Sequence, residues 1–194
     1  MTIPNVKTAT EFDVNAVIDA LKLAFVADPA TRWVWPDSQK YLLYFSKFAK
    51  AFGGKAFEHR SAHYVGSYYG AALWLPPNVD PDVDTILALL QETTSEESQR
   101  VVPEVFDIVG RCHPNEPHWY LPLLGVEPHH QGKGLGSLLM KHALTVCDKD
   151  NSLAYLESSN PRNIPFYKRH GFELLGTIQV KEFPLIFPML RKPR

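Results

Sequence analysis

The chain has 194 residues, a formal net charge of −1 at pH 7 and 45% hydrophobic content. This length and apolar content predict one domain, residues 1–194, around a single core. The near-neutral charge argues against a protein that binds nucleic acid through bulk electrostatics. No apolar run reaches the roughly 18 residues of a membrane span, and the N-terminus carries no apolar leader, so we expect a cytoplasmic protein.

The N-terminal half is predicted to combine helices with one strand hairpin. Thr10 is expected to cap a helix whose inner face includes Phe12 and which ends at Asp28. Trp33 and Trp35 then fall in a loop rather than on a periodic helical face. The expected elements, in order, are a strand at 3–7, a helix at 10–27, a helix at 38–52, paired strands at 62–65 and 70–75, and helices across 82–112 with breaks near 93–97 and at Pro103.

The C-terminal half alternates strands and helices. Its expected elements are a strand at 118–126, a helix at 134–149, a strand at 153–157, a helix at 163–170, and strands at 172–180 and 184–190. This order of strands, helix, strand, helix and strands indicates an α+β fold with one mixed sheet.

A glycine-rich loop joins the strand at 118–126 to the next helix. Gly132, Gly134 and Gly136 are spaced two apart in this loop. Glycines let a backbone approach a ligand closely, and the first N–H groups of a helix have no partners within it. Together with the positive end of the helix dipole, this geometry binds an anion, most often a phosphate.

Two other phosphate-binding motifs match this loop less well. A P-loop requires Gly-Lys-Ser/Thr, whereas Lys133 is followed by Gly134. A dinucleotide-binding βαβ unit fits better locally, because Glu157 ends the following strand at a suitable distance. Too few residues follow Glu157, however, to supply the further βα units of a doubly wound sheet.

Gln131-x-x-Gly134-x-Gly136 resembles the pyrophosphate-binding motif of the GNAT superfamily of acetyl-CoA-dependent N-acetyltransferases. Residues 156–172 carry a similar asparagine loop, a helix with a tyrosine and a closing Gly-Phe. Within the superfamily, the Gln-Gly-Lys-Gly-Leu-Gly loop and Pro-Arg-Asn-x-Pro-Phe-Tyr are most similar to the puromycin N-acetyltransferase-like branch. The resemblance covers residues 118–190 well and the first 110 residues in outline.

The resemblance implies a GNAT-like fold: a mostly antiparallel sheet flanked by helices, with a splayed strand pair that holds acetyl-CoA, and no metal. Pro122 and Gly125 agree with a splay, because proline removes a ladder donor and glycine marks close approach; a poorly paired edge strand is the alternative. Superfamily spacing favours Asn160 as the pantetheine ligand, and the puromycin-like branch favours Asn163. The implied CoA ligands are Leu124, Gly125, Val126, Gln131, Gly132, Lys133, Gly134, Leu135, Gly136, Ser137, Asn160, Asn163 and Tyr167.

The resemblance also implies that the Tyr167 phenol stabilises or protonates the departing CoA thiolate. A phenol has a reference pKa of ~10, against ~8.5 for a thiol. The attacking amine must first lose a proton, so a proton acceptor is needed. Glu157, at the end of the strand at 153–157, and Tyr120 and His118, on the preceding strand, are the candidates.

Trp33 and Trp35 are candidate walls of an acceptor pocket. The chain is thus predicted to be an acyltransferase that moves an acetyl group from acetyl-CoA to a primary amine of a small molecule in a ternary complex, as a monomer or homodimer. A non-catalytic acyl-CoA sensor of the same fold is the alternative. Tyr167 favours the enzyme, because a sensor does not need a phenol beside the sulfur.

Overall fold

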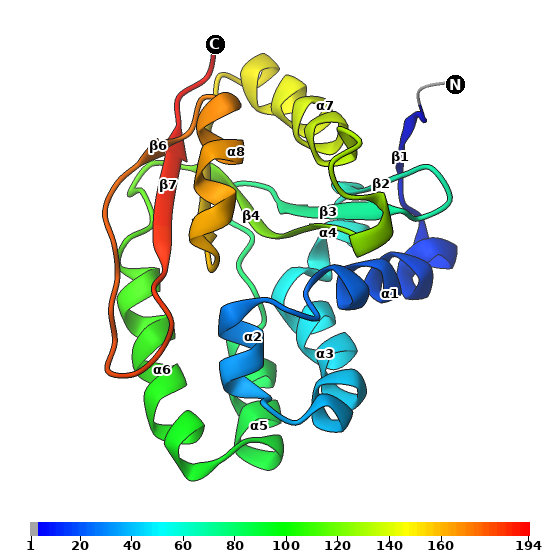
Figure 1. The fold of residues 1–194 in the computed structure, drawn as a ribbon. Coiled ribbons are helices and arrows are strands. Elements are labelled where there is room, and N and C mark those ends of the chain that lie inside the picture. The colour runs from blue at the N-terminus through cyan, green and yellow to red at the C-terminus, as the bar shows by residue number, and fades with distance from the viewer. Residues whose placement is uncertain (1–3) are drawn as a thin grey trace.

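The computed structural model describes residues 4–194, which form a seven-stranded sheet with helices on both faces (Figure 1). The strand order is β1-β2-β3-β4-β5-β7-β6. Within the described residues β4 and β5 pair in parallel and the other neighbours pair antiparallel, as the sequence predicts. The strands are β1 (Val6–Thr8), β2 (Ala62–Val65), β3 (Gly70–Leu75), β4 (His118–Val126), β5 (Leu153–Ser158), β6 (Glu173–Leu174) and β7 (Phe187–Arg191).

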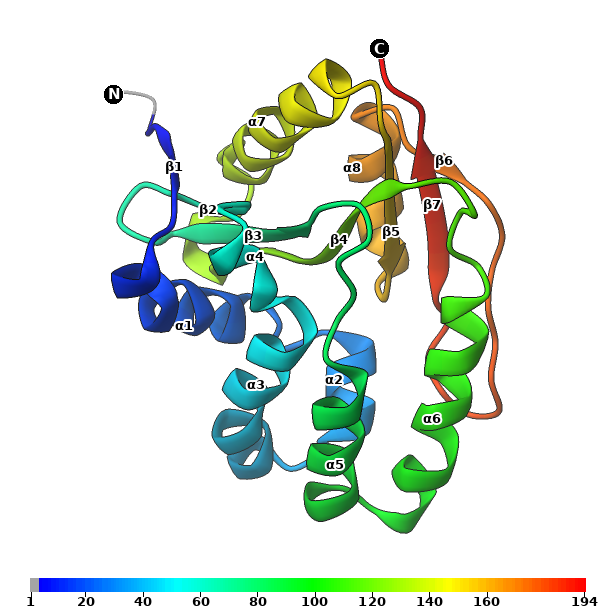
Figure 2. The ribbon, with the colours of Figure 1, turned by 180° about the vertical axis from the view of Figure 1, so that it is seen from behind.

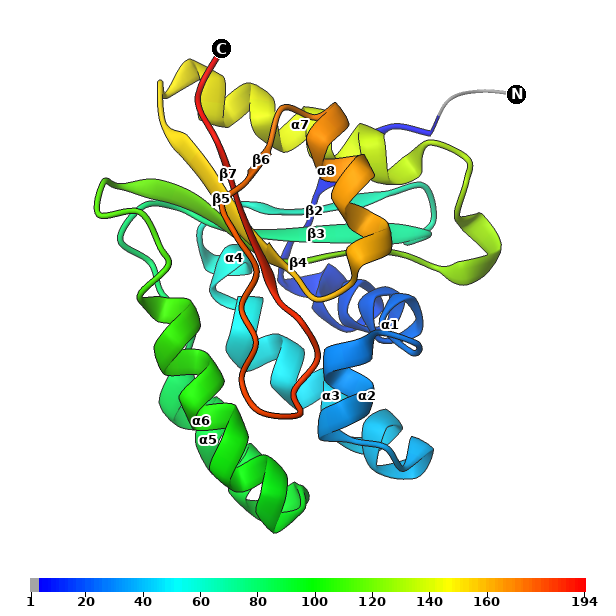
Figure 3. The ribbon, with the colours of Figure 1, turned by 60° about the vertical axis from the view of Figure 1, so that its left-hand side comes forward.

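The helices divide between the two faces of the sheet. α7 and α8 cover one face, and α1, α2 and α3 lie on the other (Figures 1 and 2). α5 and α6 follow one another as a pair that projects away from the sheet (Figure 3). The α-helices are α1 (Val14–Ala24), α2 (Pro29–Val34), α3 (Ser38–Gly53), α4 (Lys55–Glu58), α5 (Val83–Thr93), α6 (Glu96–Gly110), α7 (Leu135–Lys149) and α8 (Ile164–Arg169). No helix in the described chain is long and apolar enough to cross a membrane.

Alternating side chains of the central strands build two apolar cores. On β3, Leu73 and Leu75 join the core shared with α1 and α3, whereas Ala72 and Trp74 join the core under α7. Burying a large aliphatic or aromatic side chain contributes roughly 1.5–3 kcal/mol, so both helical layers are held firmly against β3 and β4. β4, which leads into the glycine-rich loop, is therefore held in place by packing on both faces of the sheet.

The N-terminal half departs from the predicted elements in three places. Residues 29–34 form α2 instead of a loop, because Asp28 caps this helix and Pro29 occupies its first position. Phe12, predicted on an inner helical face, lies in a short 3₁₀ turn (Glu11–Asp13) and is 90% exposed. Pro103 lies inside α6 and does not end it. The expected first strand begins at Val6, and its predicted start at Ile3 lies outside the described residues.

Near the C-terminus, the strand predicted at 172–180 is mostly absent. β6 comprises Glu173 and Leu174, and beyond it Ile178 forms an isolated bridge with Ile186. The backbone of this segment turns between 174 and 186 and makes few ladder bonds, although its composition favours a strand. The segment instead reaches α2, where Phe183 packs on Trp33.

Candidate active site

β4 and β5 separate after a short parallel contact. His118, Trp119 and Tyr120 pair with residues 153–155 of β5, and residues 121–126 of β4 have no partner on that side. Pro122 lies just beyond the last pair and lacks a backbone N–H. This opening, called the wedge below, confirms a splayed strand and rejects the edge-strand alternative, since β4 lies between β3 and β5.

Backbone groups of β4 face into the wedge. In an antiparallel ladder, successive residues direct their N–H and C=O groups alternately toward and away from the partner strand. Glu127 donates its N–H to the Tyr69 carbonyl on the β3 side, 2.9 Å away, so the alternate residues Leu124 and Val126 face the wedge. Gln131 Nε2 donates to the Val126 carbonyl at 3.0 Å. The N–H groups of both residues and the Leu124 carbonyl are left for a ligand.

Gly125 lies between these two residues but has a different environment. Its backbone groups face β3, and a Cβ placed there would lie 2.5 Å from Cβ of Ala24 on α1. The missing side chain therefore lets α1 approach β4. The structure places Gly125 among the residues that shape the site rather than among those that face the wedge.

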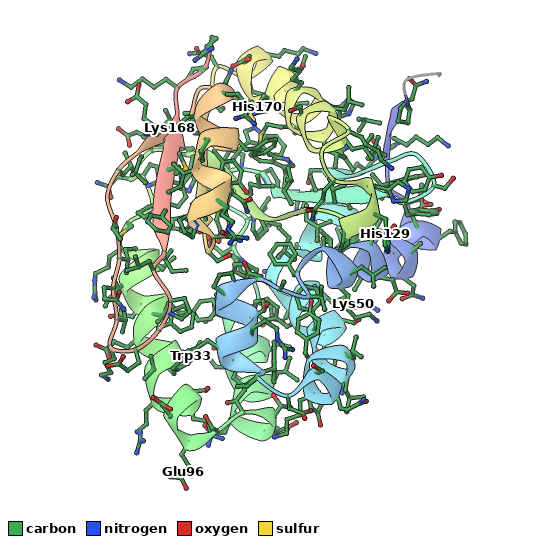
Figure 4. The ribbon with its side chains drawn as sticks, in the orientation of Figure 1. Trp33, Lys50, Glu96, His129, Lys168 and His170 are labelled. Atoms are coloured by element: carbon green, nitrogen blue, oxygen red, sulfur yellow. The ribbon has the colours of Figure 1, made fainter. Side chains whose placement is uncertain are left out.

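The N-terminus of α7 follows directly from the loop after β4. Gly132 and Gly134 have φ of 74° and 81°, in the left-handed region that glycine adopts readily, and a Cβ on either would meet nothing within 4 Å. No side chain caps this helix in the described chain, so its first N–H groups are free. Lys133 Nζ donates to the carbonyl of His129, which is labelled in Figure 4, at 2.9 Å. Free N–H groups at the positive end of a helix suit a pyrophosphate.

The two candidate asparagines have different surroundings. Asn160 Oδ1 accepts the Arg162 N–H at 3.0 Å and so caps the turn before α8. Asn163 lines the cavity described below. Of the two, only Asn163, at the puromycin-like spacing, is among the residues that line this cavity.

Tyr167 on α8 is buried and lines the same cavity. Burial, and secondarily the negative charge of Asp28, raises the pKa of its phenol far above the usual value. The phenol therefore stays protonated at neutral pH and can donate. Lys168 and His170, labelled in Figure 4, lie toward the end of α8 that is distant from α2.

A cavity of about 520 Å³ extends from the wedge into the space between the N-terminal helices and α6. Phe25, Val34, Trp35, Phe48, Phe52, Val102, Val105, Phe106 and Phe183 give it apolar and aromatic walls. Asp28, Asp80 and Glu157 supply carboxylates, and among the described residues no lysine or arginine lines it. The cavity therefore suits a cation with an apolar body.

The two tryptophans predicted to wall an acceptor pocket have different surroundings in the structure. Trp35 is buried, lines the cavity and donates its indole N–H to Thr93 Oγ1 at 3.1 Å. Trp33, labelled in Figure 4, does not line the cavity. Its ring packs edge-on against Phe183, with centroids 5.0 Å apart. The helical turn of α2 directs these two side chains to different sides.

Asp28 is a cavity carboxylate that the sequence did not single out. Its Oδ1 accepts the Thr31 N–H at 3.0 Å, and its Oδ2 accepts a hydrogen bond from Ser159 Oγ. Burial raises the pKa of this carboxyl despite those hydrogen bonds. The sequence signal was present, because Asp followed by Pro is typical of a helix start as well as of a helix end.

The candidate proton acceptors lie near the parallel contact between β4 and β5. Burial, with the negative charge of Glu157, holds the pKa of Tyr120 well above its usual range, so this phenol can donate a hydrogen bond but does not serve as a base near neutral pH. Glu157 Oε1 lies 3.1 Å from Nε2 of His113, a residue that the sequence did not suggest. His113 precedes β4 in an irregular segment, and no motif marks it.

Known proteins share sequence features with this chain. Residues 80–172 match the model of the acetyltransferase (GNAT) family. The chain is 31% identical over 146 residues to an uncharacterised N-acetyltransferase of Schizosaccharomyces pombe, a match that covers 66% of this chain and 58% of that relative. The chain thus spans little more than half the length of this curated relative.

Solved structures share the whole fold. The structure described as histone acetyltransferase HPA2 and related acetyltransferase, from Corynebacterium glutamicum, is 26% identical with a TM-score of 0.68, covering 100% of this chain and 98% of that one. Arylalkylamine N-acetyltransferase 2 from Aedes aegypti is 14% identical with a TM-score of 0.70, covering 98% and 99%. The chain has the single-domain fold of GNAT acetyltransferases, and close to half of its residues match that family's model.

Proposed function

We propose that the protein transfers an acetyl group from acetyl-CoA to a primary amine of a small molecule, by direct attack within a ternary complex. The observation that carries this proposal is the single cavity that joins the wedge, the Tyr167 phenol and an acidic, aromatic-walled space. Donor and acceptor can meet there without a covalent enzyme intermediate.

The donor is bound mainly by backbone groups. The pantetheine arm lies along the wedge, where it pairs with Leu124 and Val126, and Asn163 contacts it from the opposite side. The pyrophosphate lies at the first turn of α7, cradled by residues 131–137. This placement brings the thioester to the end of the wedge where Tyr167 lines the cavity.

Tyr167 then acts on the leaving group. The amine nitrogen forms a bond to the thioester carbon, the C–S bond breaks, and the phenol hydrogen passes to the departing sulfur. A wedge N–H stabilises the carbonyl oxygen while it carries negative charge. The raised pKa of Tyr167 keeps the phenol hydrogen in place until the thiolate forms.

The acceptor is a compact amine with an apolar or aromatic part. A volume of about 520 Å³ falls within the roughly 300–1,000 Å³ typical of small-molecule sites. Asp28 offers a carboxylate to the ammonium, and Trp35 with the cavity phenylalanines accepts the apolar part. The names of structurally similar proteins point to histones, to arylalkylamines and to polyamines such as agmatine, and the aromatic walls of the cavity favour arylalkylamines. The Pro-Arg-Asn-x-Pro-Phe-Tyr segment further supports the puromycin N-acetyltransferase-like branch.

The decisive experiment measures free-thiol release from acetyl-CoA across arylalkylamines, aminonucleosides, polyamines and lysine peptides. We expect turnover with one of the first two classes. Turnover with peptides alone would refute the small-molecule acceptor. Tight CoA binding without thiol release from any amine would instead favour an acyl-CoA sensor.

A further inference from the structure

Three titratable side chains form a continuous chain of contacts at the base of the cavity. His118 Nδ1 lies 2.8 Å from the Glu116 carbonyl oxygen, and His118 Nε2 lies 3.0 Å from His113 Nδ1. His113 Nε2 lies 3.1 Å from Glu157 Oε1. Both histidines and Glu157 line the cavity, so the chain ends where an acceptor would bind.

Counting hydrogens fixes how many protons this chain of contacts holds. The Glu116 carbonyl can only accept, so His118 donates from Nδ1 and, when neutral, accepts at Nε2. His113 then donates from Nδ1, and its Nε2 presents a lone pair to a carboxylate. Oε1 of Glu157 is accordingly one of the buried side-chain atoms in residues 4–194 without a hydrogen-bond partner. Three contacts need three hydrogens, and two neutral imidazoles supply two.

From this geometry we infer that His118, His113 and Glu157 act as a triad that takes up one proton, and that His113 and Glu157 receive it from the acceptor ammonium. The inference rests on the proposed function and adds to it the residues that remove this proton. Without the proton, two lone pairs face each other in a buried site, which is unfavourable. With it, all three contacts become hydrogen bonds.

Two buried phenols border the triad. Tyr120 on β4 and Tyr155 on β5 pack against the His113 ring, with centroids 4.8 and 4.5 Å away. Burial raises the pKa of both phenols well above the usual value, so they stay neutral. The remaining titratable groups near the triad are Cys112, which acts on Tyr155, and Asp80, which acts on His118 from across the cavity. No lysine or arginine lines this cavity in the described chain to compete for Glu157.

Every proton of the reaction can then be traced. The ammonium gives one proton to the triad, and the neutral amine attacks the thioester carbon. As the C–S bond breaks, sulfur takes the Tyr167 hydrogen, and the nitrogen returns a proton to the phenolate oxygen. The products are the amide and CoA thiol, with one proton on the triad that is later released to solvent. His118 acts through His113 and is a positioning residue.

Glu157→Gln tests the inference with little change of shape. An amide N–H supplies the third hydrogen but does not titrate, so CoA affinity and the melting temperature should be retained. We expect kcat/KM to fall by about 10²–10⁴, the range of general acid–base groups, and its rise with pH to disappear. Glu116→Gln is the matched control, since it removes an exposed carboxylate nearby and keeps the carbonyl; its profile should match wild type.

His118 variants separate positioning from packing. His118→Gln retains a hydrogen-bond acceptor for His113 Nδ1 and should preserve the pH profile of kcat/KM. His118→Ala removes that acceptor and should shift the profile. Nitrogen NMR of the histidine rings, measured without any substrate, should show His113 gaining a proton in wild type and not in Glu157→Gln over the same pH range.

Two results would overturn the triad. The first is a Glu157→Gln enzyme that keeps its turnover and its increase of kcat/KM with pH. The second is a His113 ring whose protonation, followed by NMR, is the same in wild type and in Glu157→Gln. A wild-type protein that acetylates no amine but shows the coupled titration would support the triad and refute the proposed acetyl transfer.

Discussion

The proposed donor and acceptor sides of the cavity are built in opposite ways. The donor side comes from two short stretches, residues 124–137 and 160–167, and relies largely on backbone N–H and C=O groups. The acceptor side is assembled from side chains between residues 25 and 122, with Phe183 and Ile186 added from the far end of the chain. A common donor needs a fixed backbone cradle, whereas an acceptor is selected by side chains that different elements contribute. Four substitutions test this division.

Tyr167→Phe should have the largest effect, because Tyr167 lies where the two sides meet. The change removes one hydroxyl and keeps the ring, so stability and CoA affinity should change little. Steady-state turnover should fall by about 10²–10⁴. Tyr44→Phe on α3, outside the cavity lining, is the control and should leave turnover unchanged. An active Tyr167→Phe enzyme would mean that water protonates the thiolate.

Gly134→Val should damage the donor side alone. A β-branched side chain is strained at φ 81° and extends into the open space where the pyrophosphate would lie. Calorimetric CoA affinity should fall at least about tenfold, or ~1.4 kcal/mol. Gly176→Val, also in open space but without a positive φ, should bind CoA normally. Undiminished affinity in folded Gly134→Val would refute the cradle.

Asp28→Asn should damage the acceptor side alone. The amide can still cap α2 but no longer attracts an ammonium, so the acceptor KM should rise by up to about tenfold with CoA affinity unchanged. Asp19→Asn, an exposed carboxylate on α1, is the control. Because burial raises the folded-state pKa of Asp28, the native state favours the protonated form; that contribution to stability is present below the unfolded pKa and is lost as pH rises. Asp28→Asn should therefore melt no lower than wild type at neutral pH, and a lower melting temperature would contradict this assignment.

Trp35→Phe should have the smallest effect, and it distinguishes two residues that the sequence treats alike. A smaller ring leaves part of the acceptor wall vacant, so the acceptor KM should rise about threefold, or roughly 0.7 kcal/mol. Loss of the bond to Thr93 should also lower stability by about 1 kcal/mol. Trp33→Phe should leave acceptor kinetics unchanged, and an equal response of both variants would place Trp33 in the pocket after all.

The sequence predicted the strand and helix on either side of the glycine-rich loop well, because the signals for them are local. The bounds of β2, β3 and β4 were predicted correctly, since alternation and turn residues mark them. Asp28 and His113 were missed because their roles depend on distant partners: Ser159, which donates to Asp28, is 131 positions away. α2 was missed because six residues give too little periodicity to outweigh a proline.

The missing side chain of Gly125 lets α1, which leads to Asp28 on the acceptor side, pack closely on β4 of the donor side. One added methyl group would collide with Ala24 and push α1 outward, and Asp28, a few residues further along, would move with it. In the proposed reaction, the distance from the amine to the thioester therefore depends on the missing side chain of Gly125, near the end of β4. We therefore expect substitutions around the cavity to change which amine is accepted, and a side chain at Gly125 to change how close any amine comes to the thioester.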